Sequence, residues 1–173
     1  MATHVTRVTG SEAYRIGGAL LLLAIAAILT AFGFEHIGGY RPCELCLMQR
    51  WAYYFAIPAA FAGMALVSAE QGKLAALVFF TIALAFLGNA GLGVYQAGAE
   101  WKLWAGPATC TGQQSVATDA RSLIEAMKAT NVVRCDEAQI RILFLSFAGW
   151  NAIISLLLFA AGLKAAFAAA DQR

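Results

Sequence analysis

Four long apolar runs separate shorter polar segments along this chain. No run carries a charged residue, and together they cover Ile16–Phe34, Trp51–Val67, Leu74–Tyr95 and Ile142–Leu163. Each has about the 17–25 residues that a helix needs to cross the hydrocarbon core of a bilayer. The pattern therefore predicts an all-α membrane protein built as a bundle of four transmembrane helices.

The composition supports the membrane assignment. Of 173 residues, 61% are hydrophobic and 13% are charged, against about 45–50% and 25% in soluble globular chains. A chain of this length cannot hide so much apolar surface in its own core. A net charge of +2 and the lack of a glycine-rich phosphate loop give no sign of nucleic acid as a partner. We expect one integral membrane domain over residues 1–173.

The first apolar run follows a polar segment, residues 1–15, that looks like the positive flank of a signal sequence. The run is longer than the about 7–15 apolar residues of a signal-peptide core, and no convincing cleavage site follows it. We therefore expect it to remain as an uncleaved first helix.

The number of crossings constrains where the cysteines lie. Four helices put both termini on one side of the membrane and the connections 35–50 and 96–141 together on the other. All the cysteines lie in these two connections: Cys43, Cys46, Cys110 and Cys135. The sequence thus predicts a single cysteine-bearing side.

Which side that is depends on redox chemistry. The cysteine-bearing connections hold seven of the twelve Lys and Arg residues, so a bare positive-inside count does not put them outside. We discount this count because Arg50 and Arg141 stand at helix edges and the long connection also holds five acidic residues. Paired cysteines persist in oxidising compartments. If the cysteines are redox-active, they face such a compartment.

The strongest chemical signal is the Cys-x-x-Cys pair, Cys43 and Cys46, just before the second apolar run. A helix start favours a thiolate, and such pairs can have thiol pKa values lowered into the range of about 3.5–7.5. Arg50 follows Cys46 by one helical turn, so its charge falls on the same helix face. These residues alone leave three interpretations open: a redox dithiol, half of a zinc site, or a structural disulfide.

Four cysteines allow three disulfide connectivities. Cys43–Cys46 is local and easily formed, which leaves Cys110–Cys135. Zinc modules usually present two close pairs, and the wide spacing of Cys110 and Cys135 disfavours that interpretation. Two disulfides on one side of a membrane suggest a relay, in which the outer pair meets a soluble thiol protein. Electrons that reach the inner pair then need an acceptor in the bilayer, and a quinone is the obvious one.

The long connection has two further features. Trp101 and Trp104 at its beginning suit the lipid–water interface. Ala117–Asn131 has a weak helical pattern, which fits either a short amphipathic helix on the membrane or a short solvated helix in the loop.

An ordered set of motifs carries a resemblance to a known family. The chain resembles the disulfide-bond-formation protein B (DsbB) family of bacterial inner membranes over nearly its whole length, through Pro42–Arg50, Ala97–Trp101, Gly106–Cys110, Arg134–Glu137 and Leu145–Asn151. The resemblance implies a protein-disulfide:quinone oxidoreductase. Its expected partners are a DsbA-type periplasmic oxidase of the thioredoxin fold and the membrane quinone pool, either ubiquinone or menaquinone. The cysteines would face the periplasm and both termini the cytoplasm.

The resemblance also implies a role for each motif residue. Cys110 would form the mixed disulfide with the soluble oxidase, and Cys135 would pass the reducing equivalents on to Cys43. Cys46 would be the thiolate that contacts the quinone, and Arg50 matches the family's arginine at the quinone. Gln49 either contacts the residues that bind the quinone or packs at the helix start.

One position departs from the family pattern. Several members carry a histidine near the quinone, and our alignment puts Gln96 there. A glutamine can donate a hydrogen bond to a quinone oxygen, but unlike histidine it does not titrate near neutral pH. The proton source for quinol formation is therefore open. Glu35 and His36 lie close to the motif in sequence, and we interpret both as surface loop residues.

Two other functions remain as alternatives. A redox protein like vitamin K epoxide reductase is also a helical bundle with a Cys-x-x-Cys motif, but there the motif lies near the last helix. A membrane scaffold with two structural disulfides would not be an enzyme, and its cysteines would resist mild reductant.

Overall fold

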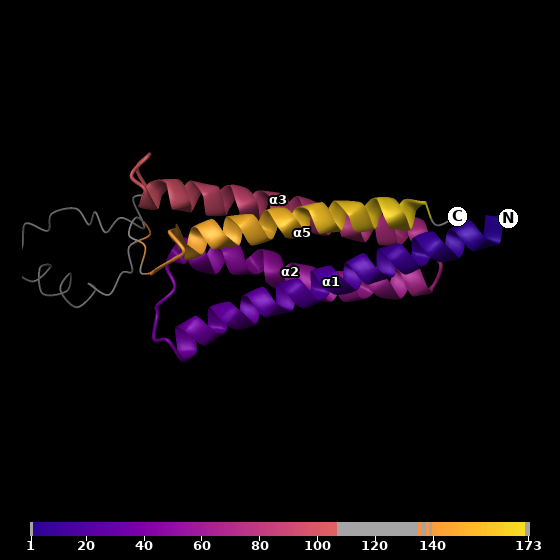
Figure 1. Cartoon of the computed structure of the whole chain (residues 1–173), viewed down its shortest axis with the longest axis horizontal. Coiled ribbons are helices and arrows are strands. Elements are labelled where there is room, and N and C mark those ends of the chain that lie inside the picture. The colour runs from indigo at the N-terminus through magenta and orange to yellow at the C-terminus, as the bar shows by residue number, and fades with distance from the viewer. Residues whose placement is uncertain (1, 107–134, 136–137, 139, 172–173) are drawn as a thin grey trace, which may run out of the picture.

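The computed structural model describes residues 2–106, 135, 138 and 140–171. Within them the chain forms four helices and a small hairpin: α1 (Ala2–His36), α2 (Glu44–Ser68), α3 (Gly72–Glu100), β1 (Arg141–Ile142), β2 (Leu145–Ser146) and α5 (Phe147–Ala170). The helices run alongside one another in an elongated bundle (Figure 1). The segment Ala117–Asn131, with its two open interpretations, lies outside the described residues.

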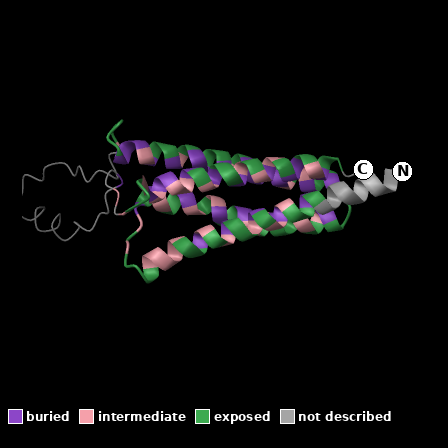
Figure 2. Ribbon diagram, viewed as in Figure 1, coloured by how far each residue is buried: buried purple, intermediate pink, exposed green. Residues whose placement is uncertain are grey.

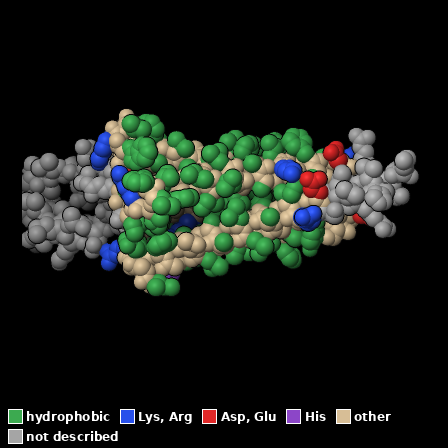
Figure 3. Space-filling model, viewed as in Figure 1, with side chains coloured by type: hydrophobic (Ala, Val, Ile, Leu, Met, Phe, Trp, Pro, Cys, Tyr) green, Lys and Arg blue, Asp and Glu red, His purple; other side chains and the backbone are tan. Residues whose placement is uncertain are grey.

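The four predicted transmembrane helices are confirmed. In the described part of the chain, four helices are long and apolar enough to cross a membrane: Glu12–His36, Glu44–Ser68, Gly72–Glu100 and Phe147–Ala170. Figure 2 shows exposed positions distributed along the helices between buried ones. Figure 3 shows that hydrophobic side chains cover the middle of one face, whereas most visible charged side chains lie toward the two ends. This distribution suits a bundle surrounded by lipid.

The ends of the bundle follow the predicted topology. Both termini lie at one end (Figure 1). The connection between α1 and α2 and the hairpin before α5 lie at the other end, where Cys43, Cys46 and Cys135 belong to one cluster. Cys110 lies outside the described residues.

The first connection is shorter than predicted because two helices extend into it. α2 begins at Glu44 rather than Trp51, and α1 continues to His36. Cys43 is the N-cap of α2, and its Sγ accepts a hydrogen bond from the Cys46 backbone N–H at 3.2 Å. This contact satisfies one of the N–H groups that a helix start leaves unpaired. The polar residues after Cys43 therefore belong to the helix and not to a loop.

The long connection also begins later than predicted. α3 continues to Glu100, so Gln96 lies on its last turns and not in the loop. Gln96 and Glu100 are polar, which ends the apolar run at Tyr95, yet both side chains are buried inside the bundle. The apolar run shows where contact with lipid ends, and α3 continues beyond that residue.

The last helix begins at Phe147 rather than at Ile142. The residues before it pair as two antiparallel strands, with Arg141 opposite Ser146 and Ile142 opposite Leu145. Leu143 and Phe144 form the turn with positive φ values of 51° and 68°, which match the twist of a two-residue hairpin. Ser146 then caps α5, because its Oγ accepts a hydrogen bond from the Gly149 N–H at 3.2 Å.

Small residues let α3 and α5 pack closely. A Cβ atom added at Gly93 would lie 3.0 Å from the Cβ of Ala152, and one added at Gly162 would lie 3.2 Å from the Cβ of Ala83. Membrane helices have no hydrophobic drive to associate, so close packing between small residues is a main source of their attraction. The Gly93–Ala152 contact holds the later part of α3 against the first turns of α5, toward the end that carries the cysteines.

We expect Gly93→Leu to push α3 and α5 apart, because the new side chain has no space at Ala152. The free energy of unfolding should fall by about 1–3 kcal/mol, the usual cost of overpacking, as measured by thermal unfolding in detergent micelles. Gly88→Leu on the same helix is the control, since no described residue lies within 4 Å of a Cβ at Gly88. Equal stability of the two variants would contradict the close α3–α5 contact.

Candidate active site

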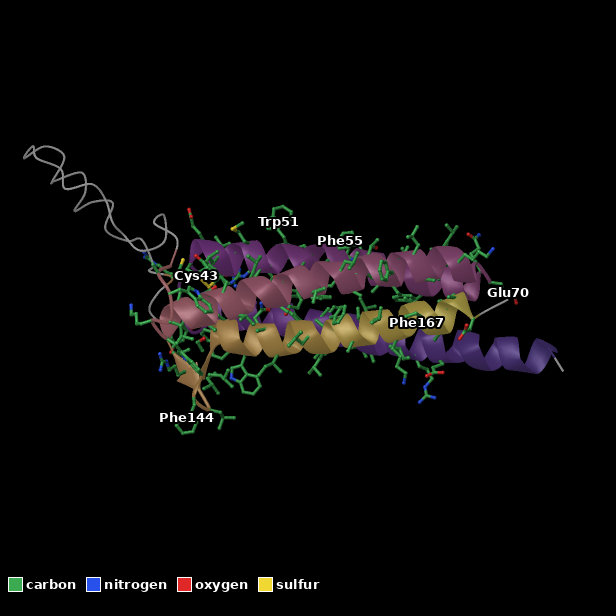
Figure 4. The ribbon with its side chains drawn as sticks, turned by 90° about the horizontal axis from the view of Figure 1, so that it is seen from above. Cys43, Trp51, Phe55, Glu70, Phe144 and Phe167 are labelled. Atoms are coloured by element: carbon green, nitrogen blue, oxygen red, sulfur yellow. A yellow bond between two sulfur atoms is a disulfide. The ribbon has the colours of Figure 1, made fainter. Side chains whose placement is uncertain are left out.

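Cys43 and Cys46 form a disulfide across the first turn of α2, with their Cα atoms 5.1 Å apart. Cys43 is buried and 4% exposed, whereas Cys46 is half-buried. The disulfide therefore stands at the N-terminus of a helix, as predicted. Reduction would leave a thiolate beside the unpaired N–H groups and the positive end of the helix dipole, and both stabilise it. Figure 4 shows Cys43 at this end of the bundle, far from Glu70 in the turn at the opposite end.

Cys135 packs into the same cluster. It is 1% exposed and lies in a group with Cys43 and Leu45, against which Cys46 also packs. The structure thus brings one cysteine of the long connection to the inner pair, while its predicted partner Cys110 is not among the described residues. In the described part of the chain, no group of three or more His, Cys, Asp and Glu side chains could hold a metal ion.

Gln96 of α3 contacts the disulfide directly. Its Nε2 lies 3.4 Å from the Sγ of Cys43 and 3.4 Å from the Sγ of Cys46. The side chain is 3% exposed, so water does not compete for this amide. An N–H donor aimed at both sulfurs stabilises negative charge that develops on either of them.

A chain of hydrogen bonds sets the orientation of this amide. The Tyr53 hydroxyl donates to Asn151 Oδ1 at 2.7 Å, and Asn151 Nδ2 donates to Gln49 Oε1 at 2.6 Å. Gln49 Nε2 in turn donates to Gln96 Oε1 at 2.8 Å. Each amide therefore accepts from one neighbour and donates to the next. The Gln96 oxygen is occupied by Gln49, which leaves its N–H groups for the sulfurs and for Glu100.

Glu100 lies one helical turn beyond Gln96 and is 7% exposed. Its Oε1 accepts a hydrogen bond from Gln96 Nε2 at 3.3 Å. Its other oxygen, Oε2, is buried and has no hydrogen-bond partner among the described residues. A buried carboxyl group thus lies one amide away from the disulfide.

Arg50 lies on the other side of Cys46, against α1. Its Nη1 donates to Glu35 Oε2 at 2.6 Å, and its guanidinium stands over the Phe32 ring, 5.2 Å from the ring centroid. Only 12% of the Arg50 side chain is exposed. The interpretation of Glu35 as a surface loop residue is wrong, because it belongs to α1 and pairs with this half-buried arginine. His36 is an exposed residue at the end of α1 rather than in a loop.

The disulfide, Gln49, Arg50, Gln96 and Glu100 line one cavity of about 460 Å³ formed by α1, α2, the end of α3 and α5. In Figure 1 the end of α1 nearest the cysteines diverges from the other helices, and in Figure 3 a hollow in the apolar surface holds basic atoms at its floor. The polar lining includes Cys46, Gln49, Arg50, Gln96 and Glu100, and most of the rest is apolar, such as Ala27 and Ile154. Volume and lining are typical of a site for a small organic molecule.

The sequence interpretation missed part of this site. Asn151 appeared only as the last residue of the Leu145–Asn151 motif, and Tyr53 and Glu100 were not singled out. Two signals were available: Tyr53 and Glu100 lie one helical turn after Gln49 and Gln96, and polar residues inside apolar helices are usually functional. Which partner each would meet on another helix could not be read from one sequence.

A disulfide at a helix start, beside an apolar cavity between membrane helices, is the arrangement of a membrane-bound thiol–disulfide oxidoreductase. The family model described as "Disulfide bond formation protein DsbB" matches residues 14–165, and the chain belongs to this family. The resemblance inferred from the motifs is thereby confirmed. Searches of curated proteins and of solved structures found no match. Membership implies an oxidoreductase that takes part in disulfide bond formation, in a family of inner-membrane proteins.

We expect Asn151→Leu to destabilise the bundle, because it removes the link between Tyr53 and Gln49 and leaves polar groups unpaired in an apolar interior. Interhelical hydrogen bonds in membranes contribute about 0.6 kcal/mol on average and up to about 1.7 kcal/mol, so a loss of about 1–2 kcal/mol is expected in thermal unfolding. Thr30→Val is the control, since the Thr30 hydroxyl donates to the Ala26 carbonyl within its own helix and to no other helix among the described residues. Unchanged stability of Asn151→Leu would show that the chain of hydrogen bonds is not structural.

Proposed function

We propose that the protein reoxidises a DsbA-type periplasmic dithiol oxidase by disulfide exchange and passes the electrons to a membrane quinone. The observation that carries this proposal is the Cys43–Cys46 disulfide in the wall of a largely apolar cavity of about 460 Å³. Family membership supports the role in disulfide bond formation. The cavity lies within membrane-spanning helices, where a lipid-soluble acceptor is found.

The cavity residues fit a quinone. The volume of the cavity lies in the range of about 300–1,000 Å³ that is common for small-molecule sites, and the cavity lining is mainly apolar with a few polar groups. Arg50 and Gln96 supply N–H donors suited to a carbonyl oxygen. A bound quinone would supply the two-electron acceptor of the reaction.

The proposed exchange steps take the order that the resemblance to the family implies. A thiolate of the soluble oxidase attacks the Cys110–Cys135 disulfide at Cys110, and its second thiol releases it as the oxidised partner. The reduced Cys135 then attacks Cys43, which breaks the Cys43–Cys46 bond and frees Cys46 as a thiolate; Cys110 resolves the new Cys43–Cys135 bond. The packing of Cys135 beside Cys43 supports this order of attack.

The position of Cys46 in the first turn of α2 favours Cys46 as the thiolate of the pair, because a helix N-terminus stabilises negative charge. It is half-buried and lines the cavity, and Gln96 Nε2 lies 3.4 Å from its sulfur. The Arg50 guanidinium adds positive charge from the next turn of α2. We assign Gln49 to holding the Gln96 amide in place rather than to binding the quinone itself.

The proposed orientation puts the cysteine end of the bundle in the periplasm and both termini in the cytoplasm. The four spans and the common end of the cysteines support two sides with different chemistry. Disulfide exchange with a soluble partner needs an oxidising compartment.

We expect Cys46→Ser to abolish electron transfer to quinone, because the thiolate that would reduce the acceptor is gone. The measurement mixes the purified protein with a reduced DsbA-type partner and a soluble quinone analogue and follows the quinone absorbance. Leu47→Ser, at the exposed next residue, is the control and should keep turnover. The decrease in quinone absorbance should also require Cys110. Turnover that persists in Cys46→Ser would exclude the proposed function.

We expect Arg50→Ala to raise the KM for the quinone analogue about tenfold or more, with a smaller change in the KM for the reduced partner. A hydrogen bond from a charged group contributes about 1.5–3 kcal/mol, and 1.4 kcal/mol corresponds to a factor of ten. Arg15→Ala, at an exposed arginine near the other end of α1, should leave both values unchanged. Equal effects of Arg50→Ala on quinone and partner would mean that Arg50 is structural.

A further inference from the structure

The proposed function leaves one buried ionisable group without a role. Glu100 lines the same cavity as the disulfide and is almost completely buried. It ends α3, one helical turn after Gln96. The electron path through the cysteines makes no use of it.

The contacts of Glu100 connect it to the sulfurs. The Nε2 atom of Gln96 lies 3.3 Å from Glu100 Oε1 and 3.4 Å from the sulfurs of both Cys43 and Cys46. A single amide nitrogen therefore stands between the carboxyl group and the disulfide. Glu100 Oε2 has no hydrogen-bond partner in the described part of the chain, so one oxygen is available to carry a proton.

Charged and titratable groups approach Glu100 from each packed element. Arg141 of β1 and the Ser146 hydroxyl of β2 act on the carboxyl group. α2 contributes the two cysteines, and Cys135 packs against them. On α1, Glu35 is paired with Arg50 of α2 along the same cavity. Lys102, which follows in the chain, is exposed. Among these groups, the charge that changes during the reaction is the one on the sulfurs.

Reduction of the disulfide brings new negative charge to this site. Two electrons break the S–S bond and leave two thiolates, and in an apolar surrounding they repel a nearby carboxylate strongly. Gln96 cannot relieve the repulsion by binding a proton, because an amide does not titrate near neutral pH. A proton on Glu100 relieves it at once and keeps the hydrogen bond from Gln96.

We propose that Glu100 takes up one proton when the Cys43–Cys46 disulfide is reduced and releases it when the disulfide forms again. Reduction then consumes two electrons and two protons: one proton binds Glu100, the second binds the Cys43 thiolate, and Cys46 remains a thiolate. The soluble dithiol supplies both electrons, and it loses two protons as it becomes a disulfide. Reoxidation returns two electrons and two protons together. The inference rests on the proposed function in that a quinone acceptor needs this same pair of protons to become a quinol.

The test measures how the reduction potential of the inner disulfide depends on pH. The full-length protein is equilibrated with glutathione buffers between pH 6 and pH 8, above the ordinary carboxyl pKa of about 4.3 and below the ordinary thiol pKa of about 8.5. Free thiols are then alkylated, and the peptide that carries Cys43 and Cys46 is quantified by mass spectrometry. No quinone and no soluble partner are present.

We expect reduction of the Cys43–Cys46 disulfide in the Glu100→Gln variant to take up one proton fewer than in the wild type. The potential should then change less steeply by about 30 mV per pH unit, because a factor of ten in a two-electron equilibrium corresponds to 29.6 mV. Glu100→Asp keeps a titratable carboxyl group and should keep the steeper dependence. Glu44→Gln is the matched control, since Glu44 lies between the two cysteines in sequence but is exposed. Equal slopes for wild type and Glu100→Gln would overturn the proposal.

A second measurement needs no variant. The infrared difference spectrum of reduced minus oxidised wild-type protein should show the carbonyl stretch of a newly protonated carboxylic acid. Its absence would overturn the proposal even if Glu100→Gln did not fold. The outcomes also separate this inference from the proposed function. If the quinone is turned over but the reduction potentials of wild type and Glu100→Gln have equal pH slopes, only the role of Glu100 is excluded. If the slopes differ but the quinone is not turned over, only the quinone as electron acceptor is excluded.

Discussion

The contact between the Gln96 amide and the two sulfurs of the Cys43–Cys46 disulfide is the interaction on which the rest of the site depends. An amide in an apolar interior must have its oxygen and its N–H groups paired, because water is not there to replace a missing partner. Gln49 donates a hydrogen bond to the Gln96 oxygen, Asn151 donates to the Gln49 oxygen, and Tyr53 donates to the Asn151 oxygen. The pairing requirement thus links α2, α3 and α5 and orients a polar group toward the disulfide.

The same site needs both close packing and an opening, and different helices meet these needs. α3 and α5 approach closely through glycine and alanine, as at Gly93 and Ala152. α1 diverges from the others at the cysteine end (Figure 1), and the cavity forms beside it. The ion pair of Arg50 with Glu35 still connects α1 to α2 there. The divergence of α1 thus leaves room for the cavity, while α2, α3 and α5 remain packed against one another in the described part of the chain.

How far the sequence predicts this structure depends on what hydropathy can measure. The four spans, the common end of Cys43, Cys46 and Cys135, and a helix start close to Cys46 follow from apolar runs, parity and spacing. The helix ends do not, because polar residues in Glu44–Arg50 and Gln96–Glu100 interrupt the apolar runs although the helices continue. Gln49, Arg50 and Gln96 bond to partners on other helices, and a single sequence holds no record of such pairs. The same lack of long-range information made Glu35 look like a surface residue.

The glutamine at position 96 acquires a meaning from these contacts that its sequence position alone did not give. A histidine there could both donate a hydrogen bond and carry a proton. A glutamine donates to the sulfurs whatever the pH, so its contribution to a thiolate does not fade when a nearby group changes its protonation state. In this chain the two tasks can be divided between neighbours one helical turn apart, with Gln96 as a constant donor and Glu100 as the group able to hold a proton. Under the proposal, this division keeps an N–H donor at the sulfurs in both redox states, while Glu100 gains and loses a proton.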